Sequence, residues 1–257
     1  MDDIEESIDG NTKVISICHV HTSNGYKNNL EKLGRLAREH GVYLVVNASQ
    51  SLGAVDINVQ KMSVDFITCS AYKWALGPPG TGLMFIRKEL LEAFEPPFMG
   101  IGQEERSFED PDFNYHEYAP SSLAKTARKF EYGGHQMATG VIGLVEALKY
   151  LDKLGIENIT RRNTQLIQYL IKSLKQLNVD LPSWIDDESK VGSHVGISAT
   201  VPAKKLFESL KNQKILTITR KGYENQELLR IAPHFFNTFE EIDELVEALS
   251  EILRKNT

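Results

Sequence analysis

The sequence is poor in the features that mark secreted, membrane-spanning and disulfide-stabilised proteins. Only two of its 257 residues are cysteines, Cys18 and Cys69, and both lie inside apolar segments. We therefore expect two buried free thiols in a reducing compartment rather than a disulfide framework. No apolar run reaches the roughly 20 residues that span a bilayer, and residues 1–6 are not ordered like a signal peptide. These absences favour a cytoplasmic location.

The charge balance argues against two further classes of partner. Lysine and arginine number 29 against 35 aspartate and glutamate residues, which gives a formal net charge of -6. This excess of negative charge disfavours binding to nucleic acid or to an anionic membrane. No group of histidine, cysteine or acidic residues has the spacing of a metal site. With 41% hydrophobic residues, the chain is long enough to bury a substantial core.

Segments typical of strands and helices alternate along the first part of the chain. A helix is predicted over residues 28–40, where Leu30, Leu33 and Ala37 share one face and Gly41 ends the helix. Strands are predicted over residues 13–18 and 83–86, with two more ending at residues 46 and 69. This alternation predicts an α/β fold with a mostly parallel sheet covered by helices.

The second part of the chain has a different pattern. Helices are predicted over residues 140–151 and 160–177, and a smaller α+β unit follows with strands near residues 195–199, 216–219 and 228–231. A capping box, Thr238 and Glu241, opens the last helix. Residues 96–120 are rich in proline, glycine and aromatic residues without any period, which favours a long functional loop or an interface arm.

One lysine, Lys73, stands just past the predicted strand that ends at residue 69 and before a Gly/Pro loop over residues 77–82. A lysine shielded from water at a strand end can lose its proton near neutral pH and form a Schiff base with an aldehyde. The hydroxyls of Ser70 and Tyr72 are suited to hold a phosphate beside it. Amine and phosphate together suggest pyridoxal 5′-phosphate, although an ordinary surface lysine has the same local pattern.

The motifs on either side carry a family resemblance. A strand followed by Asn47-x-x-Gln50, the Ser70-x-x-Lys73 segment with its Gly/Pro loop, residues 130–135 and residues 229–238 together resemble the class V (fold-type I) aminotransferases. That family includes cysteine desulfurases and isopenicillin N epimerase-like proteins. The resemblance covers nearly the whole chain, and it implies a partial large domain that binds pyridoxal phosphate (residues 1–155). A linking helix and a small C-terminal α+β domain (residues 156–257) are expected to follow.

The resemblance also implies roles for individual residues. Lys73 aligns with the Schiff-base lysine, Gln50 with the glutamine near the ring hydroxyl, and Thr22 with a polar contact to the ring. Ser70 and Tyr72 match phosphate-holding positions, although relatives have histidine in place of Tyr72. Arg230 aligns with the arginine that binds the substrate carboxylate through two parallel bonds. The neighbouring Arg220 is a second candidate for the same pocket, and a surface salt bridge is the alternative role for Arg230.

Three departures from the family pattern bear on the chemistry. Asn47 replaces the aspartate that keeps the pyridine nitrogen protonated, and the neutral amide weakens that contact by about 1–3 kcal/mol. Gly134 replaces a threonine that reaches the phosphate of a partner subunit. No cysteine occurs between Lys221 and Gln226, where sulfur-transferring relatives carry a nucleophilic thiol. From this last departure we predict that the protein is not a persulfide-forming cysteine desulfurase.

The family's usual N-terminal third has no counterpart in this sequence. The expected function is therefore that of a pyridoxal-phosphate enzyme acting on a small amino acid by transamination, epimerisation or elimination. The alternative is a catalytically impaired member that serves as a subunit of a split enzyme or as a non-catalytic partner. Expected partners are the amino-acid substrate and either a second copy of the chain or a complementing N-terminal polypeptide.

Overall fold

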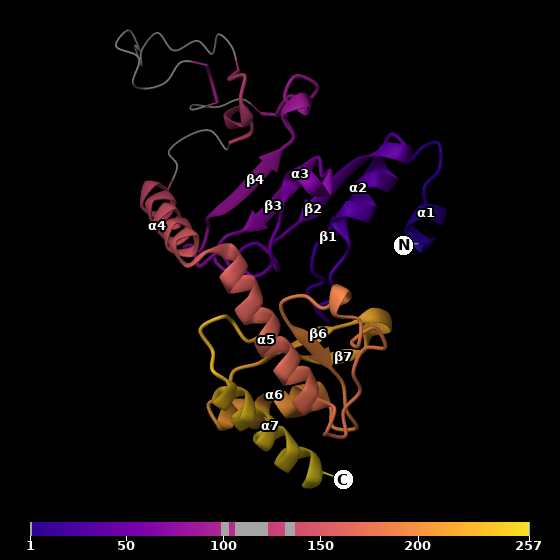
Figure 1. Ribbon diagram of the computed structural model, residues 1–257, viewed down its shortest axis with the longest axis vertical. Helices are drawn as coiled ribbons and strands as arrows, with labels where there is room; N and C mark the ends of the chain where they lie inside the picture. Colours follow the sequence, from indigo (N-terminus) through magenta and orange to yellow (C-terminus); the bar gives the residue numbers. More distant parts are fainter. Residues whose placement is uncertain (1, 99–102, 106–122, 132–136, 257) are drawn as a thin grey trace.

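The computed structural model describes residues 2–98, 103–105, 123–131 and 137–256 (Figure 1). Two sheets form the framework, one of four strands and one of three. Helix α4 (Ala138–Leu154) lies beside the first sheet, and α5 (Ile156–Leu174) runs from there to the second (Figure 1). The predicted α/β class with a mostly parallel sheet is confirmed, while most of the loop predicted over residues 96–120 lies outside the described residues.

The first sheet has the order β1-β2-β3-β4. Strands β1 (Val14–Cys18), β2 (Tyr43–Asn47) and β3 (Phe66–Ser70) run parallel, and β4 (Gly82–Ile86) pairs antiparallel with β3. Helices α1 (Asp2–Glu6), α2 (Leu30–Glu39) and α3 (Val59–Met62) accompany it. Because three parallel strands end at one edge, the loops after β1, β2 and β3 meet there.

The buried faces and the ends of two helices can be compared with those predicted from the sequence. Helix α2 buries Leu30, Leu33 and Ala37 against the sheet, as its sequence period predicts. Helix α5 begins four residues before its predicted start, because Gly155 adopts a positive φ of 82° between α4 and α5. None of the helices in the described part of the chain combines the length and apolar character needed to cross a membrane.

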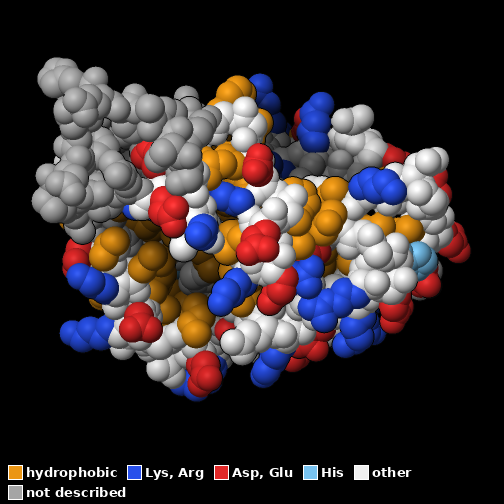
Figure 2. Space-filling model, turned by 90° about the horizontal axis from the view of Figure 1, so that it is seen from above, with side chains coloured by type: hydrophobic (Ala, Val, Ile, Leu, Met, Phe, Trp, Pro, Cys, Tyr) orange, Lys and Arg blue, Asp and Glu red, His pale blue; other side chains and the backbone are white. Residues whose placement is uncertain are grey.

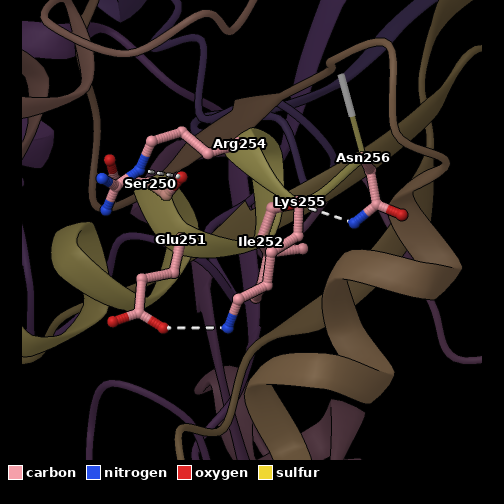
Figure 3. Close-up of polar contacts among 6 residues, drawn as sticks. All are labelled: Ser250, Glu251, Ile252, Arg254, Lys255 and Asn256. Carbon is pink, nitrogen blue, oxygen red and sulfur yellow. Dashed lines mark hydrogen bonds and ion pairs between the residues drawn. The ribbon is translucent and has the colours of Figure 1, made fainter.

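The second sheet has the order β5-β7-β6 and is antiparallel throughout. It contains β5 (Val195–Ile197), β6 (Ile218–Lys221) and β7 (Glu227–Ile231), packed with α5, α6 (Ala203–Asn212) and α7 (Phe239–Arg254). The Thr238–Glu241 capping box opens α7. At its other end, Lys255 Nζ donates to Glu251 Oε2 at 3.4 Å and Asn256 Nδ2 to the Ile252 carbonyl at 2.7 Å (Figure 3).

Short 3-10 turns connect the larger elements, and apolar side chains remain on the surface. The turns are η1 (Lys88–Leu90), η3 (Ala127–Phe130), η4 (Glu188–Lys190) and η5 (Tyr223–Asn225). Figure 2 shows hydrophobic side chains among charged ones on the face seen from above. Exposed apolar residues on β4 and α4 include Leu83, Met84, Val141, Ile142 and Val145. Both edge strands of the first sheet, β1 and β4, have one unpaired side among the described residues.

Candidate active site

Hydrogen bonds tie together the loops at the carboxyl edge of the first sheet. The His19 N–H donates to the Asn47 carbonyl at 2.9 Å, which joins the end of β1 to the end of β2. The Ser70 N–H donates to Ser49 Oγ at 2.9 Å, which joins the end of β3 to the loop after β2. The side chains that follow the three strands therefore share one region.

Gln50 is the centre of that region and is only 3% exposed. Its Oε1 accepts a hydrogen bond from Trp74 Nε1 at 3.3 Å and another from Arg230 Nη2 at 3.1 Å. Trp74 follows Lys73 directly, whereas Arg230 lies on β7 of the second sheet. The structure thus brings together predicted residues from both sheets around one amide oxygen.

Arg230 is half-buried, and among the described acidic residues none forms an ion pair with it. Its Nη1 donates to the Thr22 carbonyl at 3.3 Å, and its buried Nε has no partner. Burial, followed by the nearby Arg220, lowers the pKa of Arg230 to about 10. Arg230 therefore forms no surface salt bridge, its alternative role, with any described residue. A desolvated guanidinium with spare donors is suited to bind a carboxylate.

Lys73 is partly buried in the loop after β3. Burial lowers the pKa of its amine, and the positive charges of Arg230 and Arg220 lower it further. Its Nζ lies 5.8 Å from the centre of the Tyr72 ring. The lowered pKa raises the fraction of neutral, nucleophilic amine near neutral pH.

The other predicted residues lie around this centre with looser contacts. Asn47 is exposed, and its Oδ1 accepts from the Ser49 N–H at 2.9 Å, so its side chain shapes the loop. Ser70 is half-buried and Tyr72 is 52% exposed. Arg220 on β6 donates to its neighbour's carbonyl at 3.1 Å. Thr22 contributes its main-chain carbonyl to Arg230, and Gly134 lies outside the described residues.

Sequence reasoning missed several residues that surround this centre. The Trp74 indole stacks on His234, with ring centres 4.7 Å apart and an interplanar angle of 21°. His234 in turn stacks on Phe236 at 4.5 Å. Ser193 and His194, both buried, contact Gln50 and Thr22. The position of Trp74 beside Lys73 was an available signal, but the other contacts depend on the tertiary structure.

The residues present fit the cofactor that the sequence suggests. A partly buried amine with a lowered pKa, an amide at the end of β2, nearby hydroxyls and an unpaired guanidinium match the groups of pyridoxal phosphate and of an amino-acid carboxylate. Within the described residues, no cluster of three or more histidine, cysteine or acidic side chains is arranged to bind a metal ion.

Comparison with known proteins identifies the family. The sequence model of the family described as aminotransferase class-V matches residues 1–245 of this chain. A probable cysteine desulfurase of Pyrococcus abyssi is 28% identical over 264 residues, which cover 98% of this chain and 62% of that protein. The cysteine desulfurase of Haloferax volcanii is 27% identical over 97% of this chain and 58% of its own length. The chain therefore spans about three-fifths of the length of these relatives.

Solved structures agree with this fold. The apo cysteine desulfurase of Thermococcus onnurineus NA1 superposes with a TM-score of 0.82 at 25% identity, over 99% of this chain and 63% of that chain. A mutant of C-DES, which has glycine covalently linked to its pyridoxal-phosphate cofactor, has a TM-score of 0.84 at 20% identity, over 96% of this chain and 63% of that chain. The second likeness concerns the fold alone.

These relatives correct one prediction. The sequence-based exclusion of a persulfide-forming cysteine desulfurase is wrong, because the similar proteins from Pyrococcus and Haloferax are named cysteine desulfurases. The exclusion depended on the lack of cysteine between Lys221 and Gln226. The missing cysteine would remove only the thiol that accepts sulfur. The family match, by contrast, extends over residues 1–245. The chain belongs to the aminotransferase class-V family, whose cofactor is pyridoxal 5′-phosphate.

Proposed function

We propose that this chain contributes most of the active site of a pyridoxal-phosphate enzyme that acts at the α-carbon of a small amino acid. The observation that carries the proposal is the half-buried Arg230, which forms no ion pair with any described acidic residue and shares the Gln50 amide oxygen with Trp74, the neighbour of Lys73. When bound, the cofactor supplies an aldehyde that takes up an amine and a ring that accepts electrons from the α-carbon. The chain's own residues bind the cofactor, orient the substrate and move protons.

Each residue has a definite task in this proposal. Lys73 Nζ binds the cofactor and then carries the proton of the α-carbon as a general base. Arg230 stays bonded to the Thr22 carbonyl and to Gln50 and offers its other N–H donors, Nε–H among them, to the substrate carboxylate, with Arg220 adding positive charge. The cofactor is held by Gln50, Asn47, Ser70, Tyr72, Thr22 and Gly134. Residues 1–155 form the cofactor-binding part, and residues 156–257 form the linking helix and small domain.

The names of the relatives make cysteine the first substrate to test. Transfer of the cysteine sulfur to an added thiol, which becomes a persulfide while cysteine becomes alanine, is the reaction expected first. Transamination and epimerisation of small amino acids are the other two. We also propose that a second copy of the chain or an N-terminal polypeptide completes the pocket.

A subunit or non-catalytic role is the second candidate. The exposure of Asn47, and its bond to the Ser49 N–H, favour this role because no carboxylate is present there to keep the ring nitrogen protonated. The two candidates differ in whether the bound cofactor turns over an amino acid.

The decisive experiment is to incubate the purified chain with pyridoxal phosphate and reduce it with borohydride. A visible absorption band and a pyridoxyl group on the Lys73 peptide are expected, and Lys73→Ala should abolish both. Lys61→Ala, at an exposed lysine of α3, is the matched control. Alanine is then measured with cysteine as substrate, together with the sulfide that added dithiothreitol releases from the transferred sulfur. An unmodified Lys73 peptide would contradict the catalytic proposal, whereas modification without turnover would favour the second candidate.

A further inference from the structure

Two buried polar side chains stand immediately before β5 and reach the candidate active site from the second sheet. Ser193 is 1% exposed and His194 is 0% exposed. Ser193 Oγ donates to the main-chain carbonyl of Gln50 at 2.6 Å. His194 Nε2 lies 3.1 Å from the main-chain carbonyl of Thr22, and since a carbonyl only accepts, Nε2 is the donor. Each side chain therefore holds the backbone of one candidate site residue.

The same two residues are held a second time by Arg230. Its Nη2 donates to Gln50 Oε1 at 3.1 Å, and its Nη1 shares the Thr22 carbonyl with His194 at 3.3 Å. Displacing the backbone of Gln50 or of Thr22 would therefore move one of the two acceptors of the guanidinium. Through these bonds, the geometry of Arg230 depends on Ser193 and His194, although neither side chain forms a hydrogen bond with the guanidinium in the described structure.

Backbone packing keeps the segment around Ser193 and His194 close to the loop after β1. The Gly192 N–H donates to the Gly25 carbonyl at 2.9 Å. A β-carbon added to Gly25 would lie 1.7 Å from the His194 carbonyl oxygen, and one added to Gly196 would lie 2.5 Å from the Ser23 carbonyl oxygen. Such contacts exclude side chains at these glycines and leave little freedom to the segment.

Ser193 and His194 have few hydrogen-bond donors for the acceptors around them. Ser193 has one hydroxyl proton, yet its oxygen lies within hydrogen-bond distance of both the Gln50 carbonyl and His194 Nδ1, the latter at 3.0 Å. Burial, and then the charge of Arg230, lowers the pKa of His194 to about 3, so its imidazole is neutral. With Nε2 protonated toward Thr22, Nδ1 has no proton to give. Among the described side chains, the hydroxyl of Ser193 is thus the one donor within reach of both the Gln50 carbonyl and His194 Nδ1.

We propose that Ser193 and His194 are positioning residues, which hold the main chain of Gln50 and Thr22 and thereby aim the Arg230 guanidinium at the substrate carboxylate. Neither touches the cofactor or the reacting atoms. The part that concerns the substrate rests on the proposed function, whereas the effect on Gln50 and Arg230 is a property of the protein without cofactor.

The first test uses the indole N–H of Trp74, which donates to Gln50 Oε1. The chain has two tryptophans, so a 15N–1H spectrum contains two indole signals, assigned with Trp184→Phe. Ser193→Ala is expected to shift the Trp74 signal as its hydrogen bond to Gln50 weakens, and to leave the Trp184 signal in place. Ser183→Ala, at an exposed serine beside Trp184, should leave the Trp74 signal in place.

The second test separates binding from turnover in the loaded enzyme. Ser193→Ala and His194→Leu should each raise KM for the amino acid about tenfold, the effect of one lost hydrogen bond, with kcat changed less than threefold. His194→Gln keeps an N–H donor for the Thr22 carbonyl and should recover part of the loss. If His194→Leu does not fold, the KM and kcat of Ser193→Ala still test the positioning role.

The outcomes separate this inference from the proposed function. A Trp74 signal that stays unchanged in folded Ser193→Ala would overturn the inference, whatever the activity. A shifted signal in a protein without turnover would support the positioning role and contradict only the catalytic proposal. A rise in KM of the same size in Ser183→Ala would also overturn the positioning role.

Discussion

Arg230 and Gln50 are 180 positions apart in the sequence, yet Arg230 Nη2 donates to Gln50 Oε1 at 3.1 Å. One residue lies on the antiparallel sheet and the other follows a strand of the parallel sheet. The bond occupies one of the five N–H donors of the guanidinium and holds the group in place, while donors such as Nε–H stay available for a substrate carboxylate. This division of donors is the basis of the first prediction.

Arg230→Gln is expected to raise KM for the amino-acid substrate by about tenfold to a hundredfold. Loss of a charge-assisted bond costs on the order of 1.5–3 kcal/mol, and the variant keeps an amide that can still bond to Thr22 or Gln50. Steady-state kinetics of the loaded protein measure the effect. Arg38→Gln, at an exposed arginine of α2, is the control. An unchanged KM would show that the carboxylate binds elsewhere.

Asn47→Asp should increase the rate of proton removal from the α-carbon by about tenfold, because a carboxylate at this place stabilises a protonated ring nitrogen by about 1–3 kcal/mol more than an amide does. Exchange of the α-proton with solvent deuterium is the measurement. Asn11→Asp, at an exposed turn, adds the same charge away from the site and should leave exchange unchanged. A fall in exchange rate for Asn47→Asp would contradict the proposed role of residue 47.

Arg220→Gln should raise the pKa of Lys73 toward its ordinary value. The charge of Arg220 lowers that pKa, together with burial and Arg230, so its removal favours the protonated amine. The pH dependence of Lys73 acylation, followed by mass spectrometry of the peptide, measures the shift. Arg35→Gln, at an exposed arginine of α2, should leave the profile of Lys73 in place, and a downward shift with Arg220→Gln would refute the prediction.

Acid should destabilise the fold well before the carboxylates titrate. Burial lowers the pKa of His19 and His234 to about 4 and that of His194 to about 3, from 6.5. Below pH 6.5 the unfolded chain therefore binds more protons, so the free energy of unfolding should fall as the pH falls toward 3. Urea unfolding at several pH values measures this slope. His40→Asn, at an exposed histidine, should keep the slope, and a flat profile between pH 6.5 and 4 would contradict the prediction.

Leu206→Ala and Leu216→Ala should differ sharply in stability. Leu206 is 0% exposed in the core of the second sheet, whereas Leu216 is 80% exposed before β6. We expect a loss of about 2–5 kcal/mol for the first and less than about 0.5 kcal/mol for the second. Denaturant unfolding gives both values. Equal losses would mean that Leu216 is covered in solution.

The sequence predicted the parts of the fold that local patterns control. Continuous apolar runs before Asn47 and Ser70 identified β2 and β3, and the capping box at Thr238 placed the start of α7. The strand predicted from residue 216 begins instead at Ile218, because an exposed Leu216 gives the same apolar signal as a buried residue. Burial is decided by the tertiary structure.

In the candidate site, too, local motifs were predictable from the sequence and tertiary contacts were not. Lys73, Gln50 and Arg230 were nominated through motifs, and the structure brings Gln50 and Arg230 into contact. The roles of Ser193 and His194 were not predictable, because their acceptors are main-chain carbonyls 143 and 172 positions away. A carbonyl is present in every residue, so no residue type marks the partner in the sequence.

The close contact between residues 23–25 and 192–196 also limits which substitutions this protein can accept during evolution. The bonds there join backbone atoms, so they survive the replacement of most side chains around them. Gly25, Gly192 and Gly196 are the exceptions, because a β-carbon at each would lie within 3 Å of a neighbouring carbonyl oxygen. Evolutionary drift should therefore spare these three glycines while charged surface positions change freely, because the orientation of the two sheets depends on main-chain atoms.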